Sequence, residues 1–128
     1  MAPFKILVAD DAQFLRQALI NLIGRLAGDW QVCGEAADGE EAVRKVGELQ
    51  PDIVLVDLSL PILNGVQVVE NLQKNYPSVV IVLMSEQSED AMGRLAEETG
   101  VRGIPKSRLA LELPSALKAI AEELSPRK

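Results

Sequence analysis

The chain has 128 residues, of which 48% are hydrophobic and 25% are charged, and its formal net charge at pH 7 is −6. This length fits one domain, and the absence of a basic tract argues against nucleic-acid binding by this segment. No apolar run approaches the roughly 18 residues that span a membrane, and the first residues lack a signal-peptide pattern, so we expect no membrane association and a cytoplasmic protein.

Apolar runs typical of buried strands alternate along the chain with amphipathic patterns typical of helices. In chain order we expect strand 4–9, helix 12–27, strand 31–36, helix 39–49, strand 53–56, helix 65–75, strand 79–84, helix 88–98, strand 101–104 and helix 109–124. Five strand–helix units in succession predict an α/β fold. It is a single doubly wound (βα)5 domain, an open five-stranded parallel sheet with helices on both faces.

Polar side chains follow four of the expected strands. They are Asp10 and Asp11, Asp57, Ser85 and Lys106. Each has an ordinary explanation when taken alone, since Asp11 can cap a helix, Asp and Ser form turns, and a lysine is usually a solvated surface residue. In a parallel sheet, however, all of these side chains emerge at the same edge, where such sheets bind their ligands.

A cluster of this composition predicts magnesium-dependent phosphate chemistry. Three carboxylates close together repel one another unless a cation lies among them. The chain has no histidine, so neither an imidazole base nor the usual zinc ligand is available, and an oxygen-only set favours Mg²⁺. A lysine and a hydroxyl beside such a site supply the positive charge and the hydrogen-bond donor that phosphoryl oxygens need.

Over essentially its whole length the chain resembles the receiver domains of two-component response regulators. The matching pieces are "VADD" after the first strand, "VDLSLPILNG" around Asp57, "LMS" at the end of the fourth strand and the lysine of "GIPKS". The resemblance implies the flavodoxin-like strand order 2-1-3-4-5. It also implies a receiver domain over residues 1–124 and a polar tail, 125–128, that is either a true end or the start of a linker to an output domain.

The resemblance assigns a role to each clustered residue. Asp57 is then the phosphoacceptor, which takes a phosphoryl group from a phosphohistidine on a sensor histidine kinase or phosphotransfer protein. Lys106 contacts the phosphoryl oxygens, and Ser85 moves toward them. The residues implied to hold Mg²⁺ are Asp10, Asp11, Asp57 and, through its backbone carbonyl, Ser59.

The implied activity is limited to the protein itself. Because Asp57 is ionised at neutral pH, it needs no general base, and catalysis consists of positioning and charge neutralisation. The chain then has no free-standing substrate and catalyses only its own phosphorylation and dephosphorylation. The result is a switch that controls an output such as transcription. The face formed by helix 88–98, strand 101–104 and helix 109–124 is the expected site of docking or homodimerisation.

Three departures from the family pattern bear on this interpretation. Glu86 stands where a small residue usually follows the strand-four hydroxyl, and it either crowds the phosphoryl pocket or points to solvent. Ile104 is the nearest substitute for an aromatic switch residue that is absent before the lysine. Pro105 precedes Lys106, while Ser107 takes the place of the usual proline, which leaves the direction of Lys106 open.

Other classes of protein remain as alternatives to an active receiver. The main one is a pseudo-receiver that keeps the fold but signals without phosphate, as an interaction or dimerisation module. An aspartate-nucleophile phosphatase is remote, because position 59 is serine rather than a second carboxylate. A flavodoxin is remote, because no aromatic residue stands at a strand end. The single Cys33 lies in an apolar run and is expected to be an inert core thiol.

Overall fold

The computed structural model describes residues 3–125, and strands and helices alternate through them. The strands are β1 (Phe4–Ala9), β2 (Trp30–Ala36), β3 (Ile53–Asp57), β4 (Val80–Ser85) and β5 (Arg102–Pro105). The helices are α1 (Gln13–Arg25), α2 (Gly39–Leu49), α3 (Gly65–Asn75), α4 (Glu89–Thr99), the short 3-10 turn η1 (Lys106–Arg108) and α5 (Leu109–Leu124).

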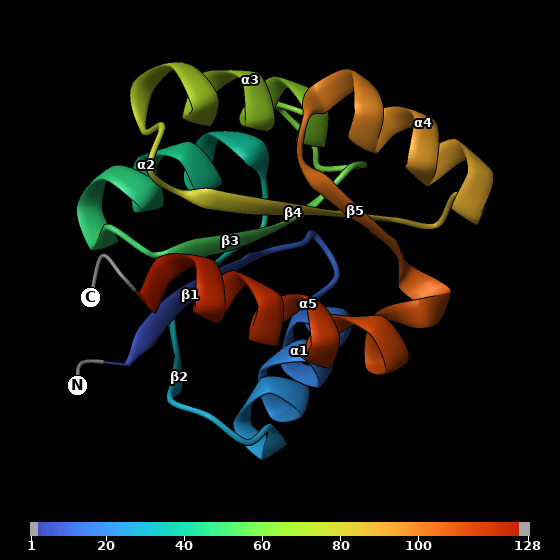
Figure 1. Cartoon of the computed structure of the whole chain (residues 1–128). Coiled ribbons are helices and arrows are strands. Elements are labelled where there is room, and N and C mark those ends of the chain that lie inside the picture. Colours follow the sequence, from blue (N-terminus) through green and yellow to red (C-terminus); the bar gives the residue numbers. More distant parts are fainter. Residues whose placement is uncertain (1–2, 126–128) are drawn as a thin grey trace.

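The five strands form one sheet in the order β2-β1-β3-β4-β5, and every neighbouring pair is parallel. The predicted fold and strand order are therefore confirmed. Figure 1 shows α2, α3 and α4 on one side of the sheet and α1 and α5 on the other. All five carboxyl ends of the strands consequently meet along one edge, and this edge carries the residues singled out in the sequence.

Strand β3 shows why its sequence is an unbroken apolar run. Ile53 and Leu55 pack into the core beneath α1 and α5, whereas Val54 and Val56 pack into the core beneath α2, α3 and α4. Successive side chains of a strand point to opposite faces, so a strand covered on both faces needs apolar residues throughout. Burial of each such side chain stabilises the fold by about 1.5–3 kcal/mol.

Side-chain caps fix the starts of three helices. The Asp38 carboxylate accepts from the backbone N–H of Glu41 at α2, and the Ser88 hydroxyl accepts from that of Ala91 at α4. At α3, Asn64 and Gln67 form a reciprocal capping box. Each cap satisfies an N–H group that has no partner within the helix, and such caps are worth about 1 kcal/mol.

The observed elements differ from the predicted ones mainly at their ends. The first helix ends at Arg25 instead of residue 27, because Leu26 already has extended backbone angles. Strands β3 and β4 each run one residue further than expected and include Asp57 and Ser85. These two polar residues are therefore held by the ladder itself, which fixes their positions more firmly than a loop would.

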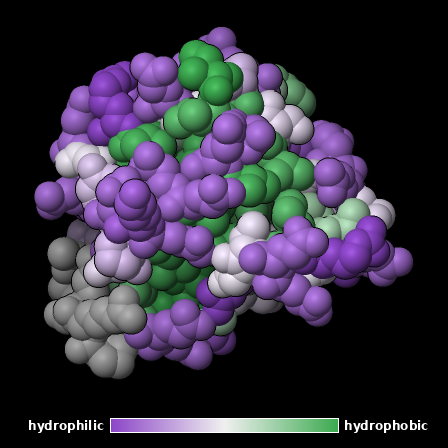
Figure 2. Space-filling model, turned by 90° about the horizontal axis from the view of Figure 1, so that it is seen from above, coloured by the Kyte–Doolittle hydropathy of each residue, from purple (hydrophilic) through white to green (hydrophobic). Residues whose placement is uncertain are grey.

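The surface is mainly hydrophilic where Figure 2 shows it, over α2, α3 and α4, with smaller apolar areas between the charged side chains. Of the helices within residues 3–125, none is both long enough and apolar enough to cross a bilayer. Of the expected tail, only Ser125 belongs to this part of the chain, and 126–128 lie outside the described residues.

Candidate functional site

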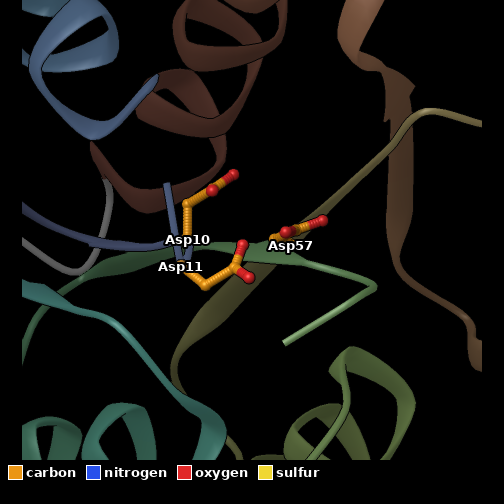
Figure 3. Close-up of side chains that lie close together, drawn as sticks. All are labelled: Asp10, Asp11 and Asp57. Carbon is orange, nitrogen blue, oxygen red and sulfur yellow. The ribbon is translucent and has the colours of Figure 1, made fainter. Parts of the chain in front are cut away.

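Three carboxylates converge at the carboxyl edge of the sheet, as Figure 3 shows. Asp10 and Asp11 follow β1, and Asp57 ends β3, the central strand next to β1. One carboxylate oxygen from each residue lies within 4.8 Å of the others. Asp10 is fully buried and Asp57 is 2% exposed, while Asp11 is exposed to solvent. The sheet therefore brings together the three residues predicted to lie side by side.

Backbone N–H groups hold the two buried carboxylates in place. Oδ1 of Asp10 accepts from the N–H of Ala12 at 2.8 Å, and Oδ1 of Asp57 accepts from that of Ser59 at 3.2 Å. Each bond closes a short turn and leaves the second oxygen of the carboxylate free to face the cluster. The ordinary explanation of Asp11 as a helix cap does not hold, because Ala12 is the N-cap residue of α1 and no side chain caps this helix.

Lys106 points into this cluster. Its Nζ lies 2.9 Å from Oδ2 of Asp10 and 3.3 Å from Oδ2 of Asp57. Pro105 does not turn it away, because it pairs with Ser85 at the end of the edge strand β5, where a missing N–H is tolerated. The η1 turn then begins at Lys106 and directs its side chain back over the ends of β1 and β3.

The charges in the cluster shift its protonation equilibria. Burial raises the pKa of Asp57, and the charge of Asp10 raises it further, against the opposing N–H of Ser59 and the ammonium of Lys106. Burial alone would lower the pKa of Lys106, but the contact with Asp10 and the charges of Asp57 and Asp10 outweigh it, so this pKa is raised. Lys106 is therefore a firmly held cation, while the surroundings of Asp57 disfavour the ionised form of its carboxyl group.

Ser85 lies on the neighbouring strand, one residue beyond the partner of Asp57 in the β3–β4 ladder. It is 2% exposed, and its hydroxyl oxygen accepts from the backbone N–H of Gln87 at 3.1 Å. The predicted turn chemistry is thus present. The hydroxyl also lies at the carboxyl edge of the sheet, on the strand next to the one that carries Asp57.

The β3–α3 loop is pinned against the strand that carries Asp57. A Cβ at Gly65 would come within 2.6 Å of the Cα of Leu58, and a Cβ at Gly39 within 1.9 Å of the carbonyl oxygen of Leu63. Both glycines are therefore required for close approach of the backbone. Within the same loop Ile62 has a φ of 72° and a side chain that is 69% exposed, an uncommon conformation for a β-branched residue.

Arg16 is a site residue that sequence reasoning missed. From α1, one of its terminal N–H groups donates to the carbonyl oxygen of Asp10 at 2.7 Å, and its Nε donates to Oε1 of Glu35 at 3.0 Å. It thereby connects the turn that carries Asp10 and Asp11 to the end of β2. Nothing in the spacing of the sequence separates this arginine from any other polar residue on α1, because its partners come from two different strands.

The cluster fits a hard divalent cation. Its ligand atoms are all oxygens, and Oδ2 of Asp10 is buried without a hydrogen bond of acceptable geometry from the described residues, although the Lys106 ammonium is close. Carboxylate oxygens with one exposed member suit Mg²⁺, which keeps several waters when it binds proteins. Asp10, Asp11 and Asp57 are the residues that would hold it.

A five-stranded parallel sheet in this order, with three carboxylates and a lysine at its carboxyl edge, defines the receiver class of signalling domain. The chain belongs to the response regulator receiver domain family, whose profile matches residues 6–117. Its similarity to known receivers therefore extends from β1 into α5 and includes every residue of the candidate site.

Characterised relatives include a chemotaxis protein CheY from Thermotoga maritima, which is 38% identical over 98 residues, or 77% of this chain and 80% of that protein. A protein-glutamate methylesterase/protein-glutamine glutaminase from Pyrococcus horikoshii is 32% identical over 122 residues, which cover 94% of this chain but 32% of that protein. The transcriptional regulatory protein LnrK from Bacillus subtilis is 34% identical over 99 residues, 77% of this chain and 44% of that protein. The chain thus spans less than half the length of the last two relatives.

Solved structures agree with this assignment. The response regulator domain of CheB from Thermotoga maritima matches with a TM-score of 0.78 and 30% identity, covering 94% of this chain and 95% of that one. A two-component response regulator of the LuxR family from Aurantimonas matches with a TM-score of 0.83 and 32% identity, covering 93% of this chain and 85% of that one.

Proposed function

We propose that the chain is an active receiver that accepts a phosphoryl group on Asp57 in a Mg²⁺-dependent reaction. The observation that supports this most directly is the contact of Lys106 with both Asp57 and Asp10 at the ends of neighbouring strands. An interaction module without phosphate chemistry gains nothing from three carboxylates held together at a cost in repulsion. The pseudo-receiver is therefore the less supported of the two readings.

The positions of the groups support a role for each residue. Oδ2 of Asp57 faces Lys106 and is the oxygen suited to attack phosphorus, with the donor's leaving group departing on the opposite side. Mg²⁺, when bound by Asp10, Asp11 and Asp57 with the carbonyl of Ser59, supplies positive charge for the transferred oxygens. Lys106 then pairs with a phosphoryl oxygen in place of Asp57, and Ser85 turns its hydroxyl toward another.

Family membership supports a proposal for the donor and for the output. Receiver domains interact with histidine kinases or phosphotransfer proteins, and we propose such a phosphohistidine donor for Asp57. We further propose a cytoplasmic location and signalling as a homodimer, or to a partner, through the face of α4, β5 and α5. Residues 1–124 are proposed as the receiver domain, with the tail 125–128 either as its end or as the start of a linker.

Intact-mass measurement after incubation with acetyl phosphate tests the central claim. We expect a gain of one phosphoryl group that requires Mg²⁺ and disappears in Asp57→Asn. A folded chain that gains no phosphoryl group either as the wild type or as Glu86→Gln, beside a known receiver that does, would support the pseudo-receiver instead.

Titration of the chain with Mg²⁺ alone tests the metal site separately. Ligand binding to the folded state raises the free energy of unfolding, by about 1.4 kcal/mol at ten times the dissociation constant. We expect this gain for the wild type and its loss in Asp11→Asn. The control is Asp29→Asn, which removes an exposed carboxylate before β2, at the opposite edge of the sheet.

A further inference from the structure

Glu86 is a feature of the site edge that the proposed function leaves without a role. It directly follows Ser85, in the short loop between β4 and α4, and its side chain is 84% exposed. The loop holds it in place on both sides: the hydroxyl of Ser85 accepts from the N–H of Gln87, and Ser88 caps α4. The backbone of Glu86 is therefore fixed near the strand end that carries Asp57, while its side chain is solvated.

The carboxylate of Glu86 is the third to approach Lys106. Its Oε1 lies 4.0 Å from Nζ of Lys106, which in turn lies 3.3 Å from Oδ2 of Asp57. These two contacts place a full negative charge within about 7 Å of the phosphoacceptor oxygen, a distance over which charges still act through water. No crowding is needed for such an effect, because the side chain points outward.

Within residues 3–125, Glu86 forms no ion pair with a cation other than Lys106. Among the described residues near the β4–α4 loop, Arg108 is already paired with Glu89 and Glu112. Lys106 is consequently shared by Asp10, Asp57 and Glu86. With Asp11 included, the edge around Asp57 holds four carboxylates and one ammonium, so the approach to Asp57 carries excess negative charge even with a divalent cation in place.

We infer that Glu86 determines donor specificity: its charge slows phosphoryl transfer from small dianionic donors and leaves the chain dependent on a protein donor. The inference rests on the proposed function. A small donor such as acetyl phosphate brings only negative charge to this edge, where its P–O bond to acetate breaks and a P–O bond to Asp57 forms. A protein surface can place a basic side chain opposite Glu86 and remove the repulsion.

The test compares the wild type with Glu86→Gln, which keeps the size of the side chain and removes its charge, and with Glu86→Ala, which removes both. Second-order rate constants are measured by intact mass at saturating Mg²⁺ and low ionic strength, with dianionic acetyl phosphate and with monoanionic phosphoramidate. For E86Q we expect an increase of about fivefold with acetyl phosphate and about twofold with phosphoramidate, both shrinking toward unity at about 0.5 M salt.

Mg²⁺ binding provides a second readout without any phosphodonor. The same charge that repels a dianion attracts a divalent cation, so we expect E86Q to bind Mg²⁺ about fivefold more weakly at low salt, as measured by calorimetry. A faster reaction with the anionic donor together with weaker binding of Mg²⁺ would indicate an effect of the charge of Glu86. A steric effect would not change the two in opposite directions. Glu70→Gln, an exposed carboxylate on α3, controls for the change in net charge.

The outcomes separate the inference from the proposed function. Equal rates for the wild type and E86Q, with the wild type phosphorylated, overturn the inference and leave the receiver activity standing. A rate increase in E86A but not in E86Q assigns the effect to crowding and also overturns it. Phosphorylation of E86Q alone supports both proposals, whereas no phosphorylation of any variant overturns both.

Discussion

The ammonium of Lys106 lies 2.9 Å from Oδ2 of Asp10, a carboxylate that is fully buried. The two residues are 96 positions apart in a chain of 128, and they meet because β1 and β5 end at the same edge of the sheet. In the absence of a metal ion this contact compensates the buried charge of Asp10. In the proposed reaction, Mg²⁺ would take over this compensation and leave the lysine available for phosphoryl oxygens.

Replacement of Lys106 by methionine should lower the stability of the metal-free chain. The substitution keeps the length of the side chain but leaves Asp10 buried beside Asp57 without a cation, a loss that typically costs about 3–5 kcal/mol when one partner of a buried pair is removed. Urea unfolding in EDTA measures the change. Lys118→Met, on the exposed side of α5, is the matched control and should change stability by less than about 0.5 kcal/mol.

The same Lys106 variant should bind Mg²⁺ more tightly than the wild type while it accepts phosphate more slowly. The ammonium competes with the metal ion for Asp10 and Asp57, so its removal should improve Mg²⁺ affinity by about threefold or more. Calorimetry and the acetyl phosphate assay give the two numbers. Weaker Mg²⁺ binding in a folded variant would show that Lys106 organises the carboxylates instead of competing for them.

Asp57→Asn should stabilise the metal-free chain at neutral pH. The unfolded carboxyl titrates near its ordinary pKa of 3.8, and burial raises the pKa in the folded state. Between these two pKa values the folded state binds more protons, so the stability of the wild type falls as pH rises and the loss is complete above the folded pKa. The variant lacks this loss, which amounts to about 1.4 kcal/mol for each pH unit that separates the two pKa values.

Urea unfolding in EDTA as a function of pH checks the expectation for Asp57. The difference between variant and wild type should be absent well below pH 3.8 and should reach a plateau toward neutral pH. Asp29→Asn serves as the control for the loss of one negative charge far from the site. A variant that is less stable than the wild type at neutral pH would mean that the Asp57 carboxylate is stabilised by its contacts.

Arg16→Lys should weaken Mg²⁺ binding more than it affects folding. The guanidinium bridges the carbonyl of Asp10 and the carboxylate of Glu35, and a lysine keeps the charge but cannot span both partners. Mutation of a residue that orients a metal ligand typically lowers metal affinity by about tenfold or more. Calorimetry gives the Mg²⁺ affinity of the variant, and urea unfolding gives its free energy of unfolding. A loss of affinity without a matching loss of stability would show that Arg16 positions the turn that carries Asp10 and Asp11. An unchanged Mg²⁺ affinity would restrict Arg16 to a structural role.

Ile62→Gly should stabilise the chain or leave its stability unchanged. The residue has a φ of 72°, in the left-handed region where glycine pays no steric cost, and most of its side chain is exposed. Relief of this strain is worth about 1–2 kcal/mol, partly offset by the greater flexibility of glycine in the unfolded chain. Thermal unfolding measures the net change. A clear loss of stability would mean that the isoleucine side chain contributes packing that outweighs its backbone strain.

Much of the fold could be predicted because its signals are local. The run Ile53–Val56 is apolar at every position, which indicates a strand covered on both faces, and Asp38 and Asn64 mark helix starts by short-range capping. Errors occurred at element ends, as at Arg25. Whether the chain continues the helix there or turns toward the next strand depends on contacts with the rest of the fold.

The site was predictable to the extent that topology alone creates it. Once the strands are parallel and ordered β2-β1-β3-β4-β5, Asp10, Asp11 and Asp57 must meet at one edge, and the sequence by itself determined that convergence. The tertiary structure alone decided the direction of Lys106 past Pro105, the bridge of Arg16 from Asp10 to Glu35, and the approach of Glu86 to Lys106. Periodicity and turn chemistry act over a few residues, whereas these three contacts join segments that are distant in sequence or depend on how a side chain turns across the edge of the sheet.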